Sequence, residues 1–331
     1  MLSDPLIIVG VCAPERRRYA ERLSAVTGRA VVTIGSRDST AVDAPLLGPA
    51  AFIAEMATEA DVVHSALAAR TPPLPIVCVV DATHMIDDFL SGDPLSEQAP
   101  PGDDDGDHGA RARRAASLVE IASLVCLVGW EELETATLSM LMALTSHLNP
   151  HARVRLSHDP EDDVRSLEAS PLPLPPFPER AGWVCASNHE HDPYMTDIRV
   201  ATVRYERLRP FHPGRLSRTL DEIDAGRFGM VVRSAGFCRI ATRPHTLARW
   251  DHVGSAMWID PLTTSLHDGS TGQDIAFTGI DLHAPLLFAA LDEAGVTDRE
   301  LTSGPAGWRR FDDPLPPWPG YDVTDAERDT R

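Results

Sequence analysis

The sequence contains no lysine, and all 30 of its basic residues are arginine. This absence excludes lysine Schiff bases, lysine general bases and the lysine with which P-loop proteins hold the phosphates of a nucleotide. The basic residues face 49 acidic ones, which gives a formal net charge of -19. Such a surface repels nucleic-acid backbones and anionic lipid head groups. We therefore expect neither a nucleic acid nor a membrane as a direct partner.

Cysteine is scarce, and long apolar runs are absent. Five cysteines stand far apart with no C-x-x-C pair, and three of them, Cys12, Cys78 and Cys126, lie in apolar runs typical of buried, reduced thiols. No apolar run approaches the roughly 20 residues of a membrane span. The N-terminal apolar run is short and lacks the preceding basic residues of a signal peptide. These features predict a cytoplasmic protein.

Short apolar strands alternate with helical segments in the first half of the chain. The expected strands cover residues 6–11, 30–34, 75–82, 123–128 and 152–156, and the clearest helix lies between Trp130 and Pro150. Near-continuous Val, Ile and Leu content is what strands buried on both faces require. The pattern predicts an α/β domain, with a parallel sheet covered by helices.

Prolines are concentrated at 168–183, "EASPLPLPPFPERAGW". Because proline lacks a backbone donor and favours extended conformations, this segment predicts a semi-rigid spacer between two domains. We expect a first domain over 1–167, a linker over 168–196, a second domain over 197–318 and a flexible tail over 319–331.

The second half predicts an α+β domain. An alternating strand over 197–206 leads into a helix that ends near Ala225, and strand-like runs follow at 228–242, 255–261 and 273–281 before a helix at 284–294. That order predicts an antiparallel sheet with helices on one face.

Five stretches of this half together resemble the C-terminal domain of the CobW family of GTPase-related metallochaperones. They are "RPFHPGRL" (209–216), "VVRSAGFCRIATRP" (231–244), "WDHVGSAMWIDP" (250–261), "QDIAFTGIDL" (273–282) and "DDPLPPW" (312–318). Their order and spacing agree with the family over roughly 120 residues, which is more specific than any single motif. The resemblance implies a P-loop-NTPase-like parallel sheet followed by a smaller CobW C-terminal domain.

The first half resembles the same family in layout and departs from it in its motifs. "PIVCVVDATHMIDDFL" looks like the Walker-B strand and places Asp81 at the acidic position. The family's Gly-x-x-x-x-Gly-Lys-Thr is replaced by "GVCAPERRR", and its Asn-Lys-x-Asp by "VGWEEL". The family's Cys-x-Cys-Cys metal motif is absent from residues 35–56. The resemblance therefore implies a degenerate nucleotide-binding-like domain.

The replaced turn lacks the parts of a phosphate cradle. Such a cradle needs converging backbone N–H groups, a cation on the β- and γ-phosphates and a hydroxyl on Mg²⁺. Here Pro14 removes one N–H, Glu15 adds repulsive charge, and neither lysine nor Ser or Thr follows. We expect no nucleotide hydrolysis and no GTP cofactor. Asp81 is then either a relic that holds Mg²⁺ or a cap for the next helix.

The segment "CASNHEHDP" at 185–193 is the candidate metal site. In an extended chain His189 and His191 point the same way, so both imidazoles would reach one ion, with Asp192, Glu190 or Cys185 as further ligands. CobW-like proteins are similar in carrying histidine-rich stretches before this domain. Zinc is the cofactor that this interpretation predicts, and the alternative is an exposed polar loop.

The motif "RPFHP" is the most recognisable part of the resemblance. Because His212 stands between Phe211 and Pro213 at a predicted helix start, the motif indicates fold and interface and not catalysis. Arg209 and Arg215 are expected to pair with carboxylates. No G-x-S-x-G or H-E-x-x-H pattern is present to suggest a hydrolase.

The sequence leaves three functional hypotheses. The first is a non-hydrolysing CobW-like protein in bacterial zinc homeostasis that binds metal or acts as an adaptor. The second follows from a resemblance to actinobacterial CobW-like proteins without a P-loop, and is an adaptor that recruits a hibernation factor to ribosomes under zinc limitation. The third is a metallochaperone with residual GTP binding. Each implies a protein partner, namely a metal-requiring client, a hibernation factor or a ribosomal protein.

Overall fold

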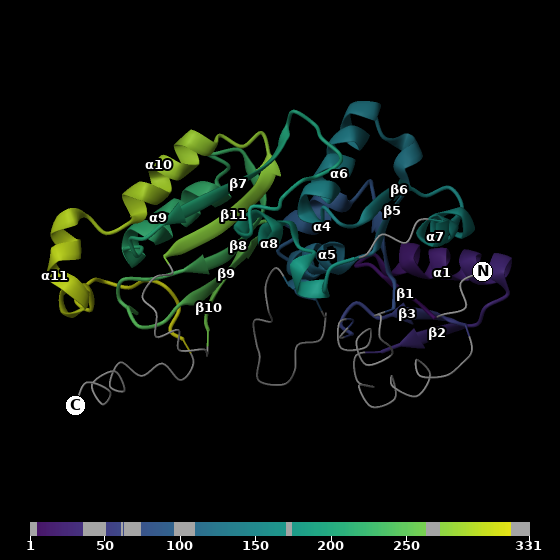
Figure 1. Ribbon diagram of the computed structural model, residues 1–331, viewed down its shortest axis with the longest axis horizontal. Coiled ribbons are helices and arrows are strands. Elements are labelled where there is room, and N and C mark those ends of the chain that lie inside the picture. Colours follow the sequence, from purple (N-terminus) through teal and green to yellow (C-terminus); the bar gives the residue numbers. More distant parts are fainter. Residues whose placement is uncertain are drawn as a thin grey trace.

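The computed structural model describes residues 5–35, 51–60, 62, 74–95, 110–169, 174–262 and 272–318. They form one parallel and one antiparallel sheet, with helices outside and between them (Figure 1). None of the helices in these ranges combines the length and the apolar character needed to cross a membrane. The tail predicted at 319–331 lies outside the described residues.

The first sheet is parallel and has the strand order β2-β3-β1-β4-β5-β6. Its strands are β1 (Leu6–Val9), β2 (Val31–Ile34), β3 (Ile53–Met56), β4 (Ile76–Asp81), β5 (Leu124–Val128) and β6 (Arg153–Leu156). The central strands are buried along nearly all of their length, as their apolar composition requires. The predicted α/β class of the first half is confirmed.

Helices cover both faces of the parallel sheet. One face carries α1 (Ala13–Thr27) and α7 (Pro160–Ala169). The other carries α4 (Met85–Leu90), α5 (Ala110–Ile121) and α6 (Thr135–Leu148), with the short 3₁₀ turn η1 (Trp130–Glu132) before α6. The helix predicted between Trp130 and Pro150 is thus η1 followed by α6.

Strand β3 does not appear in the pattern of apolar runs. It inserts between β2 and β1, and all four of its side chains are buried, Glu55 among them. A four-residue strand with a central carboxylate resembles a loop in sequence, because buried carboxylates need a partner that the local pattern does not show.

The second sheet is antiparallel and has the order β10-β9-β8-β11-β7. Its strands are β7 (Val200–Arg207), β8 (Met230–Cys238), β9 (Ala248–Val253), β10 (Ala256–Pro261) and β11 (Gln273–Ile280). The helices α9 (Pro213–Asp224) and α10 (Ala284–Ala294) pack on one face, and α11 (Asp298–Trp308) follows. The predicted α+β arrangement is confirmed, whereas β9 and α11 were not predicted.

The other face of the antiparallel sheet belongs to the same apolar core as the parallel sheet. Val200, Val232, Val253 and Ile280 join one cluster of buried residues with strands of the first sheet and with α4, α5 and α6. The layers therefore run from α1 and α7 through the parallel sheet, the middle helices and the antiparallel sheet to α9 and α10 (Figure 1).

The segment predicted as a spacer contains secondary structure of its own. A 3₁₀ turn η2 (Phe177–Glu179) leads into helix α8 (Gly182–Ser187), which contacts β7, β8 and β11 as well as α6. The close approach depends on a missing side chain, because a Cβ on Gly182 would lie 2.0 Å from the His147 carbonyl oxygen. Residues 182–187 thus fill space between the sheets, where an extended spacer was expected.

Helix α11 is held by a carboxylate whose protonation we expect to control its attachment. Glu300 accepts from Arg215 at 2.7 Å and closes a capping box with Thr297. The hydrogen bond from Arg215, with those from Thr297, lowers the pKa of Glu300 from 4.5 to about 2. Because the folded-state pKa is the lower one, this stabilisation is present above pH 4.5 and is lost as the pH falls towards 2.

The expected result is a loss of hydrogen-exchange protection in residues 298–303, before the non-helical Gly304, between these two pH values and after correction for intrinsic exchange rates. In Glu300→Gln the same amides should already be poorly protected at pH 7. Unchanged protection at pH 7 in that variant would show that packing alone holds the helix.

Candidate functional site

The carboxyl ends of the parallel strands form the first candidate site. Strands β3 and β2 lie on one side of β1 in the sheet, and β4, β5 and β6 lie on the other, so the direction in which strands are added reverses at β1. Ligands of open α/β sheets bind at such a switch point. A cleft of about 400 Å³ lies there. Its lining mixes carboxylates with cations, and comprises Glu15, Arg18, Tyr19, Arg22, Asp81, Thr83, Val128, Gly129, Glu131, Glu132, Ser157 and His158.

The turn between β1 and α1 is shorter than a P-loop. Strand β1 ends at Val9 and α1 already begins at Ala13. Counted from Gly10, the Gly-x-x-x-x-Gly-Lys-Ser/Thr spacing places Glu15, Arg16 and Arg17 at the last three positions. All three lie within the helix. The backbone that cradles phosphates in a P-loop is here wound into the first turns of α1.

Arg16, at the position of the P-loop lysine, points into the protein. It is 2 % exposed, and its Nε donates to Glu55 Oε1 at 2.5 Å. Its NH1 donates to the Gly10 carbonyl oxygen and to Thr58 Oγ1, at 2.5 and 3.0 Å. The guanidinium therefore joins β3 to the β1–α1 turn and is committed to protein acceptors.

The thiol in the same turn is protonated. Burial and a hydrogen bond to Asp88 raise the pKa of Cys12 to about 12. Its Sγ lies 3.2 Å from Asp88 Oδ2, and Arg111 donates to the other oxygen of Asp88. Since the thiolate is the reactive form of cysteine, Cys12 is not a nucleophile at neutral pH.

Asp81, the predicted Walker-B residue, is 8 % exposed at the end of β4. Its Oδ1 accepts from the backbone N–H and the hydroxyl of Thr83, at 2.9 and 2.7 Å. Its Oδ2 lies 2.8 Å from His84 Nδ1. Burial alone would raise the pKa of Asp81, but these hydrogen bonds outweigh burial and lower it. Both carboxylate oxygens of Asp81 thus have partners in the next turn. Binding of Mg²⁺ by Asp81 stays a prediction.

The segment "HEHD" places its two histidines beside different partners. His189 has a left-handed backbone with φ 60°, and its Nε2 lies 2.6 Å from Arg204 NH1. His191 Nε2 donates to the His147 carbonyl oxygen at 3.0 Å. Cys185 Sγ lies 3.5 Å from His151 Nε2, and burial raises the pKa of this thiol. The shared direction expected of an extended chain is not observed.

The predicted ligands, Asp192 and Glu190 included, do not form one site. Within the described ranges, no three His, Cys, Asp or Glu side chains are grouped so that they could hold a metal ion. Zinc binding by this segment therefore stays a prediction, and the geometry does not assign it to these residues together.

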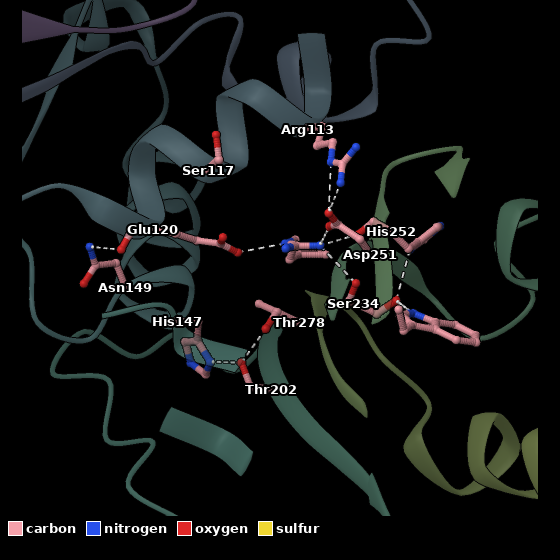
Figure 2. Close-up of polar contacts among 12 residues, drawn as sticks. Arg113, Ser117, Glu120, His147, Asn149, Thr202, Ser234, Asp251, His252 and Thr278 are labelled. Atoms are coloured by element: carbon pink, nitrogen blue, oxygen red, sulfur yellow. Dashed lines mark hydrogen bonds and ion pairs between the residues drawn. The ribbon is translucent and has the colours of Figure 1, made fainter. Parts of the chain in front are cut away.

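His147 and His191 form a pair of neutral rings. Their centroids are 5.2 Å apart, with 51° between the planes. Burial and the proximity of His191 lower the pKa of His147 to about 4, and burial also lowers the pKa of His191. Both imidazoles are uncharged at pH 7, with His147 Nδ1 held 2.9 Å from Thr202 Oγ1 (Figure 2). His147 is not predicted as a site residue from the sequence, because it lies inside an apolar helix.

The motif "RPFHP" ties the second sheet to the C-terminal segment. Phe211 is fully buried, and Arg209 and Arg215 pair with Asp298 and Glu300 at 2.5 and 2.7 Å. His212 stacks on Phe311 at 4.4 Å between ring centroids. These contacts agree with a structural role, and the assignment of an interaction role to the motif stays a prediction.

A buried ionic cluster lies between the two sheets (Figure 2). Arg233 of β8 donates to Glu120 of α5 at 2.7 Å and to Asp251 of β9 at 2.6 Å. Arg113 of α5 reaches the same Asp251 at 2.8 Å. Burial raises the pKa of Glu120, whereas Arg233 and Arg113 outweigh burial and lower the pKa of Asp251. Helix α5 is thereby fixed to the antiparallel sheet by paired charges.

Known proteins resemble this chain in both halves. Residues 200–295 match the family model described as the cobalamin synthesis protein cobW C-terminal domain. The zinc-regulated GTPase metalloprotein activator 1 of Dictyostelium discoideum is 24 % identical over 265 residues, which covers 72 % of this chain and 55 % of the relative. The chain thus spans about half the length of the curated relative that it matches.

Two solved structures are also similar, a Zn(II)-bound YjiA GTPase from E. coli and a Zn(II)-bound triple mutant of YjiA. Each is 12 % identical with a TM-score of 0.36, and the match covers 89 % of this chain and 100 % of that chain.

Proposed function

We propose that this chain, whose residues 200–295 match the CobW C-terminal domain, acts in zinc homeostasis as a binding or adaptor protein that does not hydrolyse a nucleotide. The link to zinc rests on the relative whose name describes a zinc-regulated GTPase metalloprotein activator. The absence of hydrolysis rests on the geometry of the β1–α1 turn.

That turn carries the proposal. Catalysis of phosphoryl transfer needs a cation and converging backbone donors at the phosphates. Arg16 stands where the cation belongs, and it is buried against Glu55, with Gly10 and Thr58 as its further acceptors. Reaching a phosphate would require breaking a buried ion pair, which leaves Glu55 charged and unpartnered at several kcal/mol.

A nucleotide should therefore leave the thermal stability unchanged. We expect differential scanning fluorimetry with 1 mM GTP or ATP and Mg²⁺ to show no rise in melting temperature, because a ligand stabilises only a state that it binds. Arg16→Lys should also show none, since Pro14 and the early start of α1 persist in that variant.

A GTP-dependent rise in the melting temperature of the unmodified chain would contradict the proposal and favour a metallochaperone with residual GTP binding. Each protein is compared with its own melting temperature without nucleotide. A change in stability caused by the Arg16→Lys substitution is then not mistaken for an effect of the nucleotide.

The net charge of -19 favours the adaptor form of this function. A strongly acidic surface attracts basic proteins and repels nucleic acid. If the chain recruits a hibernation factor to ribosomes, its contacts should be with protein. A pull-down from zinc-starved cells that returned neither a hibernation factor nor ribosomal proteins would count against this form.

A further inference from the structure

We propose that the imidazoles of His147 and His191 form a two-histidine site for a divalent metal ion such as Zn²⁺, with its other coordination positions open. The inference deepens the proposed role in zinc homeostasis and rests on it. It replaces the pairing of His189 with His191 by a pairing across two elements, the end of α6 and the segment after α8.

The separation of the rings fits one shared ion. Two imidazoles on a tetrahedral zinc, with Zn–N bonds of about 2.0–2.1 Å, have ring centroids roughly 5 Å apart. The observed centroid distance is 5.2 Å.

Each ring has one nitrogen within hydrogen-bond distance of a protein atom and one without such a partner in the described part of the chain. His191 Nε2 must donate to the His147 carbonyl oxygen, because a carbonyl only accepts, and so the lone pair of His191 is on Nδ1. His147 Nδ1 lies 2.9 Å from Thr202 Oγ1, which in turn lies 2.8 Å from Thr278 Oγ1. We assign the proton of His147 to Nδ1, which leaves the lone pair on Nε2. Among the described residues, His147 Nε2 and His191 Nδ1 have no hydrogen-bond partner.

This arrangement is the one that metal-binding histidines adopt. Such a histidine donates its second N–H to a backbone carbonyl, a carboxylate or a similar acceptor, which fixes the tautomer and the orientation of the ring. His191 has a backbone carbonyl in that place, and His147 has a threonine hydroxyl. Both rings are neutral, as a ligand must be.

The site has two protein ligands in the described part of the chain, since no third His, Cys, Asp or Glu completes a group there. Structural zinc sites are closed by four protein ligands, whereas other zinc sites keep a position open for water or a substrate. Water or a side chain of a client protein would complete the coordination. A site of this kind suits transient binding and transfer of the ion.

The test is isothermal titration of Zn²⁺ into the metal-free chain of 331 residues and three variants. We expect one site per chain, lost in His191→Ala and in His147→Gln and retained in His189→Ala. The last variant is the matched control, because His189 lies two residues from His191 in the same segment and its ring contacts Arg204. Circular dichroism melting curves show whether His147→Gln is folded.

Thr202→Val provides a second variant, in which His147 is kept and its hydroxyl partner is removed. Loss of such a partner weakens zinc binding by about 10- to 100-fold. Retention of the full affinity in His147→Gln, or loss in His189→Ala, would overturn the inference and leave zinc binding by the chain intact. If the unmodified chain gave no heat of binding, both the two-histidine site and a metal-binding role in zinc homeostasis would be overturned. A role as an adaptor protein would still stand, because the pull-down tests it separately.

Discussion

Arg233→Ala is expected to lower the free energy of unfolding by about 3–5 kcal/mol, because it leaves Glu120 and Asp251 as buried carboxylates without their shared cation. Arg233 is 5 % exposed, and it donates to both carboxylates at 2.6–2.7 Å. Urea denaturation at pH 7, followed by fluorescence and by circular dichroism, measures the change. The two probes should give one coincident transition in the unmodified chain, since one apolar core joins both sheets.

The matched control is Arg218→Ala, which removes an exposed arginine from α9 of the same domain. Surface substitutions of this kind usually change stability by no more than about 0.5 kcal/mol. If Arg233→Ala cost as little as Arg218→Ala, the ionic cluster would contribute nothing to the attachment of α5 to the antiparallel sheet.

Arg16→Ala is expected to cost about 3–5 kcal/mol for the same physical reason. Glu55 is 1 % exposed, and its Oε2 has no hydrogen-bond partner among the described residues, so Arg16 is its principal counter-charge. The neighbouring Arg17→Ala should change stability by no more than about 0.5 kcal/mol, because Arg17 is exposed on the same helix. Chemical denaturation of the full chain compares the two.

A double replacement separates the charge from the packing. Arg16→Met with Glu55→Met removes both buried charges and keeps similar volumes, and such exchanges are often neutral or stabilising. We expect the double variant to recover most of the stability lost in Arg16→Ala. A double variant no more stable than Arg16→Ala would show that the contacts of Arg16 with Gly10 and Thr58, and not its charge pairing, hold the turn.

The ion pairs of Arg16 with Glu55 and of Arg233 with Asp251 also explain which strands could not be predicted from the sequence. The predicted strands were runs of Val, Ile and Leu, and they are present in the structure as β1, β2, β4, β5 and β6. Strands β3 and β9 were missed, and each carries a buried carboxylate, Glu55 and Asp251. Each carboxylate is paired with an arginine of another element, Arg16 or Arg233. A local pattern cannot show a partner so distant along the chain.

The candidate site was predictable only where it depends on the residues themselves and not on contacts with distant elements. The loss of a phosphate cradle could be expected from Pro14, Glu15 and the lack of lysine, since these are properties of the residues themselves. The inward direction of Arg16 could not, because it depends on where β3 packs. Likewise His191 was singled out by its segment, whereas its neighbour His147 comes from a helix whose methionines and leucines indicated only core packing.

The shared core has a consequence for the way this chain can be divided. A cut in the proline-rich segment would separate the two sheets in sequence, yet it would leave Val200, Val232, Val253 and Ile280 on an open sheet face. Exposed apolar surface of that kind drives association with other chains. We therefore expect the second half to be poorly soluble when it is separated from the first. We expect it to need a companion that covers this sheet face as α5 and α6 do.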